Sequence, residues 1–219
     1  MKRKRLLCAV LALVLLFSAQ PVAAAANKGN QRSIIITASC RLPIIRVSVP
    51  SYASVYINPL KLPVYIDGES DTDQIISTPS CLISYSNVPL AVDVEVSGAI
   101  KPGSDMQLAS SPTGGSGTSK QAFIYFEIMQ ANTADPYEVE WAPAYDAAKH
   151  IVITGGAPVS KKNLFTIPAM TLDGEIAENG YAPFRLTGDA VKSPANAWNN
   201  KDGLNVTVAF TFTPIPYVN

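Results

Sequence analysis

The chain has 219 residues, enough for one large domain after a removable leader. Hydrophobic residues make up 47% and charged residues 16%, and 17 prolines and 13 glycines interrupt the chain. It is therefore too apolar for disorder and too interrupted for a coiled coil, a helical bundle or a collagen-like rod. Four of the 17 basic residues occupy positions 2–5, so the rest holds 13 basic and 17 acidic residues. This balance argues against nucleic acid or an anionic membrane surface as partner.

Residues 1–26 have the pattern of a secretory signal peptide. Basic residues 2–5 precede an apolar run at 6–17 and the alanines 23–26, where cleavage is expected. The run is shorter than the roughly 20 residues that a membrane-spanning helix needs. We expect a mature chain, residues 27–219, without a membrane span, secreted or held at the cell surface.

Short candidate strands, bounded by proline, glycine or asparagine, follow the leader. Prolines 43, 50, 59, 63, 79 and 89 predict that strands of the first half are short or lie at edges. Two strands, described below, are predicted firmly. The strand candidates with a weaker pattern are residues 34–38, 44–49, 54–57, 62–66, 75–84, 123–130, 151–154, 164–167 and 184–187.

Residues 67–73 place carboxylates at every second position, on Asp67, Glu69, Asp71 and Asp73. Calcium prefers several oxygen ligands from a flexible loop, so these side chains are candidate calcium ligands of low affinity. The match to an EF-hand loop is partial, because Thr78 stands where the closing glutamate belongs. The alternative is an acidic hairpin tip that binds no ligand. Apart from calcium, we expect no cofactor.

Cys40 and Cys81 remain once Cys8 is removed with the leader. An even pair in an exported chain is typical of a single disulfide. Two free thiols that act as small hydrophobic side chains are an equally good interpretation.

Two strands are predicted firmly by alternation of apolar and polar residues. Leu90, Val92, Val94 and Val96 alternate with polar or small residues, and the apolar residues 204, 206, 208, 210 and 212 repeat the pattern. Between these two strands, residues 99–120 are rich in glycine, serine and proline. We interpret this segment as a long flexible surface loop within one domain.

Residues 137–150 carry the candidate ligand-binding side chains Tyr137, Trp141 and Tyr145 beside two glutamates. Such a cluster can stack on a carbohydrate, although aromatic residues at this spacing more often belong to a core. One or two helical turns can form at residues 142–150 and 195–198. His150 is the single histidine of the chain, and no nucleophile motif accompanies it, so we predict no catalytic site.

Short strands at this spacing predict an all-β fold, an antiparallel two-sheet β-sandwich of the Ig-like or jelly-roll-like kind. Four motifs stand out in residues 44–98: Val47-Ser48-Val49-Pro50-Ser51, Ile57-Asn58-Pro59-Leu60, Gln74-Ile75-Ile76-Ser77 and the stretch from Tyr85 to Val94. Through these motifs, residues 44–98 resemble exported β-sandwich surface proteins of Gram-positive gut bacteria, distantly like the WxL-type surface domains. The Trp-x-Leu tripeptide itself is missing, since Ala142-Pro143 follow Trp141 and Asn199-Asn200 follow Trp198.

The resemblance implies a surface or extracellular-matrix role and contributes no catalytic residue. We therefore expect a non-enzymatic secreted or cell-surface protein with a structural or adhesive role. Its expected partners are cell-envelope components, glycans or like subunits. The alternative is a carbohydrate-binding or calcium-dependent lectin-like module.

Overall fold

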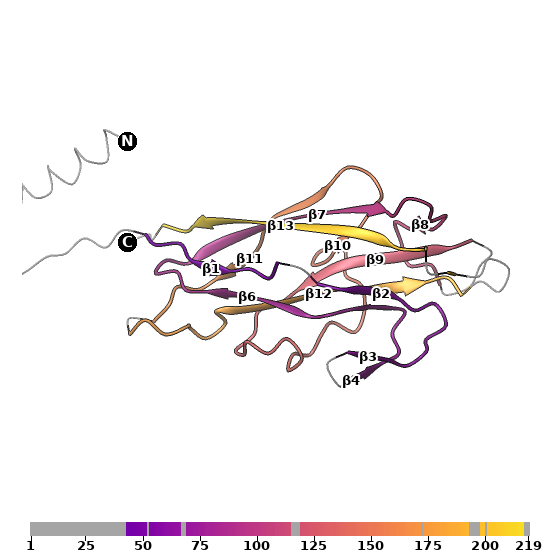
Figure 1. Ribbon diagram of the computed structural model, residues 1–219. Coiled ribbons are helices and arrows are strands. Elements are labelled where there is room, and N and C mark those ends of the chain that lie inside the picture. The colour runs from indigo at the N-terminus through magenta and orange to yellow at the C-terminus, as the bar shows by residue number, and fades with distance from the viewer. Residues whose placement is uncertain are drawn as a thin grey trace, which may run out of the picture. The chain divides into compact units, whose positions relative to one another are not determined.

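The computed structural model describes residues 43–51, 53–66, 69–114, 119–171, 173–192, 198–199 and 201–216, all within one unit, Arg41–Asn219 (Figure 1). This part of the chain is built from strands and loops without a helix. The strands are β1 (Val47–Ser48), β2 (Val55–Ile57), β3 (Val64–Ile66), β4 (Glu69–Asp71), β5 (Ile75–Ser77), β6 (Ser80–Ser84), β7 (Leu90–Ile100), β8 (Gln107–Leu108), β9 (Gln121–Ile128), β10 (Ile151–Val152), β11 (Val159–Ile167), β12 (Tyr181–Ala190) and β13 (Leu204–Pro214).

Two sheets of unequal width pack against each other. The larger sheet has the strand order β1-β6-β12-β9-β10, with β8 also paired to β9, and the smaller sheet has the order β11-β7-β13. Two further ribbons, β2–β5 and β3–β4, complete the strand pairing. Apart from β8 with β9, the strands pair antiparallel. The predicted all-β, antiparallel sandwich is confirmed.

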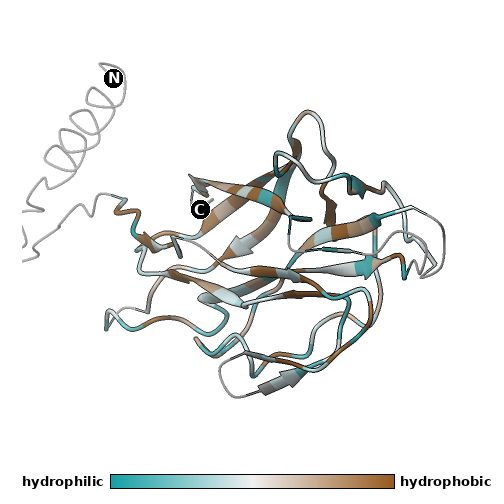
Figure 2. Cartoon of the chain, turned by 45° about the vertical axis from the view of Figure 1, so that its right-hand side comes forward, coloured by the Kyte–Doolittle hydropathy of each residue, from teal (hydrophilic) through white to brown (hydrophobic). Residues whose placement is uncertain are grey.

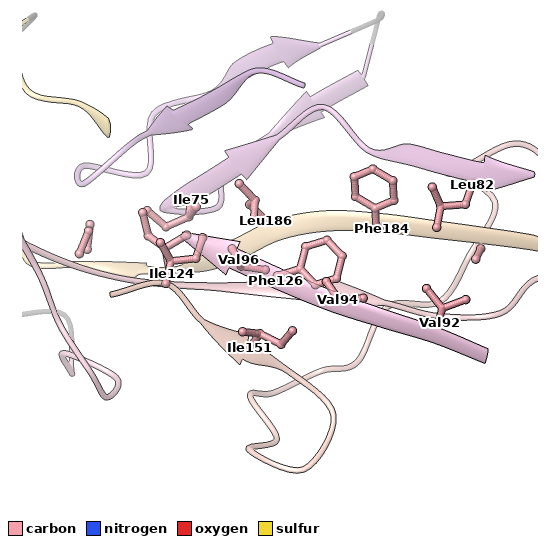
Figure 3. Packing of buried hydrophobic residues seen from close by; sticks show 14 of the residues in the cluster. Ile75, Leu82, Val92, Val94, Val96, Ile124, Phe126, Ile151, Phe184 and Leu186 are labelled. Atoms are coloured by element: carbon pink, nitrogen blue, oxygen red, sulfur yellow. The ribbon is translucent and has the colours of Figure 1, made fainter. Parts of the chain in front are cut away.

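The core lies where β7 faces β9 and β12 (Figure 3). Val92 and Val94 of β7 are fully buried, as alternation along this strand predicts. Phe126 of β9 and Phe184 of β12 meet them from the larger sheet, with ring centroids 5.6 Å apart. Alternation of apolar and polar residues is visible along several strands in Figure 2. Burying a valine, leucine or phenylalanine side chain contributes roughly 1.5–3 kcal/mol, so this contact is a major source of stability.

The strand β13 pairs with β7 along its whole length, from Leu204 opposite Ile100 to Pro214 opposite Leu90. Its five alternating apolar side chains pack against the core but are half-buried, because β13 is an edge strand. The expectation of a strand that belongs to the sandwich is confirmed.

The candidate strand at residues 75–84 is two strands, β5 and β6, separated at Thr78 and Pro79. The backbone pairing of β6 with β12 ends at Phe184. Beyond this residue, side chains of the β5 region form hydrogen bonds with the backbone of β12. Ser77 Oγ accepts a hydrogen bond from the Leu186 N–H at 2.8 Å, and Gln74 Nε2 donates one to the Ala190 carbonyl at 2.6 Å.

Other elements differ from the sequence expectations in detail. The segment 142–150 contains one turn, at residues 147–149, and no helix beyond it. In this turn the Asp146 carbonyl accepts the Lys149 and His150 N–H groups, and the Asp146 carboxylate accepts the Ala148 N–H. The other candidate helical turn, at residues 195–198, lies mostly outside the described residues. Within the segment 99–120, β7 continues to Ile100 and β8 forms at Gln107–Leu108, while 115–118 are not described.

A buried lysine fixes this segment to the turn before β13. Lys120 Nζ lies 2.6 Å from Asp105 Oδ1 and 3.0 Å from Asp202 Oδ2, and its side chain is 7% exposed. The hydrogen bonds to Asp105 and Asp202 raise the pKa of Lys120. Burial alone would raise the pKa of Asp202, but hydrogen bonds from the Asn199 N–H, Lys120 and Ser104 outweigh burial and lower it. Both groups are therefore charged at neutral pH, so the contact is an ion pair.

No helix in the described ranges has the length and apolar composition that crossing a bilayer requires.

The pairing of β12 with β9 depends on a glycine. Gly188 has φ +148°, and a Cβ at this position would lie 1.9 Å from the Phe123 carbonyl oxygen. We expect Gly188→Ala to lower the free energy of unfolding by at least about 1–3 kcal/mol, measured by urea denaturation. The control is Gly156→Ala, because a Cβ there meets nothing within 4 Å. Equal stability of the two variants would contradict the prediction.

Candidate functional site

Two of the predicted motifs line one cavity on the outer face of the larger sheet. The cavity has a volume of about 230 Å³, and its lining includes Asp71, Asp73, Tyr137, Trp141 and Arg185. The β3–β4 hairpin and the segment that follows it supply the aspartates, and the loop between β9 and β10 supplies the aromatic residues. Aromatic, acidic and guanidinium groups thus converge here from three parts of the chain. We call this cavity the aromatic pocket.

Arg185 of β12 is held in place from two sides. Its Nε donates to Glu127 Oε2 at 3.0 Å, and its guanidinium lies over the Trp141 ring, 4.5 Å from the ring centroid. The Glu127 side chain is 4% exposed, and its Oε1 accepts the Ala142 N–H at 2.8 Å. Glu127 therefore fixes both the arginine and the loop that carries Trp141, so the Trp141 ring is pre-positioned at the pocket.

His150 belongs to the same buried network. Its Nδ1 accepts the Asp146 N–H at 2.9 Å, and its Nε2 lies 3.6 Å from Glu127 Oε1. The ring stacks on Tyr125, with centroids 4.8 Å apart, and the side chain is 3% exposed. Burial lowers the pKa of His150, and the nearby Glu127 offsets only part of this effect. The histidine is enclosed and serves as a structural element of the network.

Tyr145, the third predicted aromatic residue, lies elsewhere. Its ring packs edge-on against Phe123, with centroids 5.0 Å apart, and also contacts Tyr125 and His150. Tyr137 and Trp141 thus line the pocket, whereas Tyr145 covers the outer side of β9.

The acidic loop is described only in part. Asp67 and the Glu69 side chain lie outside the described residues. Asp71 Oδ1 accepts the Asp73 N–H at 2.7 Å, which uses one of its oxygens within the loop. Among the side chains that the structure describes, no three of the types His, Cys, Asp and Glu gather as metal ligands. The calcium site therefore remains a prediction.

Cys81 lies on β6, where its Sγ donates to the Leu82 carbonyl at 3.3 Å. Burial raises the pKa of the Cys81 thiol to about 11. A thiol with this pKa is a poor nucleophile at neutral pH, because the reactive form is the thiolate. Cys40 lies outside the described residues, so the disulfide also remains a prediction.

A second, larger cavity of about 450 Å³ lies between the edges of the two sheets. One wall is formed by residues 49–51 and 53–56, and the other by the first half of β13. The core residues Phe126, Phe184 and Leu186 also line it. We call this cavity the edge groove.

Sequence reasoning missed Glu127, Arg185 and the edge groove. A glutamate inside the apolar run 121–128 is a signal for Glu127, because an acidic side chain in a buried strand needs a partner. That partner, Arg185, lies 58 residues away and becomes a neighbour only through the β9–β12 pairing, where the two residues stand opposite each other.

Comparison of the chain with models of known protein families, with curated proteins and with solved structures gives no match.

The lowered pKa of His150 predicts a pH-dependent stability. The unfolded chain takes up a proton at this residue near pH 6.5, whereas the folded chain resists it until lower pH. The unfolded state therefore binds more protons below about pH 6.5, and the free energy of unfolding should fall as the pH decreases from 7 to 5. We expect urea denaturation of His150→Asn, which has no histidine, to show a smaller loss over this range. Parallel pH profiles for both proteins would disprove the assignment.

Proposed function

We propose that the chain is a non-enzymatic secreted or cell-surface structural protein that assembles with like subunits through the open edge at β13. The expected signal peptide supports export, and the resemblance to exported surface proteins of Gram-positive bacteria supports a structural or adhesive role. The enclosed position of His150 supports a non-catalytic role, because a general base has to reach its substrate. The observation that carries the proposal is the contrast between the two edges of the smaller sheet.

The edge strand β11 has the features with which proteins prevent edge-to-edge pairing. It carries Lys161 and Lys162 and a register shift before Phe165. At this irregularity Asn163 has φ +50°, and its N–H donates to the Asp93 carboxylate at 2.7 Å. Lysines and bulges of this kind block the addition of another strand.

The opposite edge, β13, has neither feature. Its eleven residues include no charged side chain, and its register with β7 is uninterrupted. A long, regular, uncharged edge strand is a template for pairing with another strand. The difference between the two edges favours assembly at β13.

The hydrogen-bond pattern shows which backbone groups of β13 face this edge. The Lys101 N–H donates to the Gly203 carbonyl, and the Ile215 N–H donates to the Pro89 carbonyl. Since hydrogen-bonded pairs alternate along an antiparallel ladder, the odd-numbered residues of β13 bond to β7. The N–H and C=O groups of Val206, Val208 and Phe210 therefore point to the open edge.

We expect the exported chain to form concentration-dependent oligomers, measured by analytical ultracentrifugation. Val208→Pro removes one edge N–H without touching the ladder to β7, so it should weaken association by about tenfold or more. The matched control is Val208→Ala, which loses side-chain volume but keeps the N–H and should still associate. A wild-type chain that stays monomeric at high concentration would refute assembly.

A second candidate function, glycan binding, is favoured by the aromatic pocket. An aromatic face, carboxylates and a fixed guanidinium suit a sugar ring with several hydroxyl groups. Tyr137 is 44% exposed, so this part of the pocket is accessible. This function is compatible with assembly, because the pocket and the groove are separate cavities.

Glycan binding can be tested on an array, followed by titration of any glycan that binds. We expect Trp141→Ala to weaken binding by about tenfold or more, since a tryptophan at the centre of a site carries much of the binding energy. Tyr145→Phe is the control, because this ring packs on Phe123 and Tyr125 outside the pocket. Equal loss in both variants would indicate a general effect on folding, and an array without binding would exclude this candidate.

A further inference from the structure

The edge groove lies where one more strand would close the sandwich. The larger sheet is five strands wide, and the smaller sheet is three strands wide. On one side β10 lies beside β11, so the sandwich is closed there. On the other side the groove lies between the first half of β13 and residues 49–51 and 53–56. One more strand beside β13 would close this side.

The groove offers a strand both backbone and side-chain partners. Backbone groups of Val206, Val208 and Phe210 face the open edge, as derived above. Their half-buried side chains line the groove together with Phe184 and Leu186. An added strand would therefore form ladder hydrogen bonds and place every second side chain on an apolar surface.

A segment of this chain outside the described residues has matching chemistry. Residues 33–38 read Ser-Ile-Ile-Ile-Thr-Ala, with no charge and three consecutive β-branched isoleucines. The groove wall from Leu204 to Phe210 is about 20 Å long at 3.4 Å per residue, which six extended residues nearly cover. Ile34, Ile36 and Ala38 would share one face, so an apolar face is available for the groove.

The direction of the chain favours a segment from another copy. Ile44 hydrogen-bonds with Asn87, and Ile215 with Pro89, so the described chain begins at the end of the sandwich where β13 finishes. A copy's own segment in the groove would have to run toward this end, parallel to β13. Parallel pairing is slightly less stable per residue, and a segment from a second copy is free to run antiparallel.

We propose that residues 33–38 of a second copy insert into the edge groove as a strand antiparallel to β13. This inference rests on the proposed function, since it names the partner at the β13 edge. The contact is heterologous, because a segment of one copy meets a groove of the next. Repetition of a heterologous contact produces an open chain of subunits or a ring, and not a two-fold dimer.

The first test changes the segment in the exported chain. Ile36→Asp places a charge on the face that enters the groove and should weaken association by about tenfold or more, measured by ultracentrifugation. Thr37→Asp is the control, because this side chain would point away from the groove and association should change little. If Ile36→Asp associates as strongly as the wild-type chain while Val208→Pro associates more weakly, residues 33–38 are not the bound segment. Assembly at β13 would then still hold.

The second test maps the contact by photo-crosslinking. A benzoylphenylalanine in place of Val206, which lines the groove, should give covalent dimers whose cross-linked peptide contains residues 33–38. The same group in place of the exposed Thr207 should give no such product. A cross-link to the chain's own segment, recognised at the monomer mass, would overturn the role of a second copy. A cross-link to β13 of another copy would overturn the segment, and a monomeric wild-type chain would refute the proposed function as well.

Discussion

The packing of β7 against β9 and β12 is the interaction on which the rest of the structure depends. Val92 and Val94 are buried because their side chains pack against the six-stranded larger sheet. The same strand organises the smaller sheet, since both β11 and β13 pair with it. Its outward residues also contribute, because Asp93 accepts the Asn163 N–H at the irregularity of β11. The strand β7 thus contributes to the core, joins the other two strands of the smaller sheet and holds the irregularity of the β11 edge.

The unequal widths of the two sheets follow from the way the chain closes each side. Next to β11, the short β10 completes the sandwich, whereas no strand of the described residues pairs with the other edge of β13. Five apolar side chains of β13 stay half-buried for this reason. A strand bound at the edge would remove the remaining accessible surface of these side chains from water, which is favourable.

The sequence predicts those parts of the fold that depend on local pattern. Alternation of apolar and polar residues identifies β7 and β13. The strands β1, β8 and β10 are two residues long in the structure, too short to show a period. Their position depends on tertiary pairing, which no local pattern records.

The candidate site shows the same limit. Tyr137, Trp141 and Tyr145 are spaced by four residues, which suggests one shared surface, but the turns around Asp146 direct Tyr145 toward β9. The pocket instead gains Arg185 and two aspartates from other parts of the chain. Spacing in a loop predicts neighbours poorly, because the loop has no fixed period.

The strand β12 separates the two cavities and explains why both can exist in one small sandwich. The aromatic pocket and the edge groove share the lining residues Ser77, Arg185 and Leu186. The wall between the two cavities is therefore only one strand thick. It is held on both sides, since Ser77 accepts the Leu186 N–H and Glu127 accepts a hydrogen bond from Arg185. A partition fixed by buried hydrogen bonds resists displacement when one cavity is filled. A strand bound in the groove would therefore leave the pocket in place, so the proposed assembly and the proposed glycan binding are compatible in one molecule.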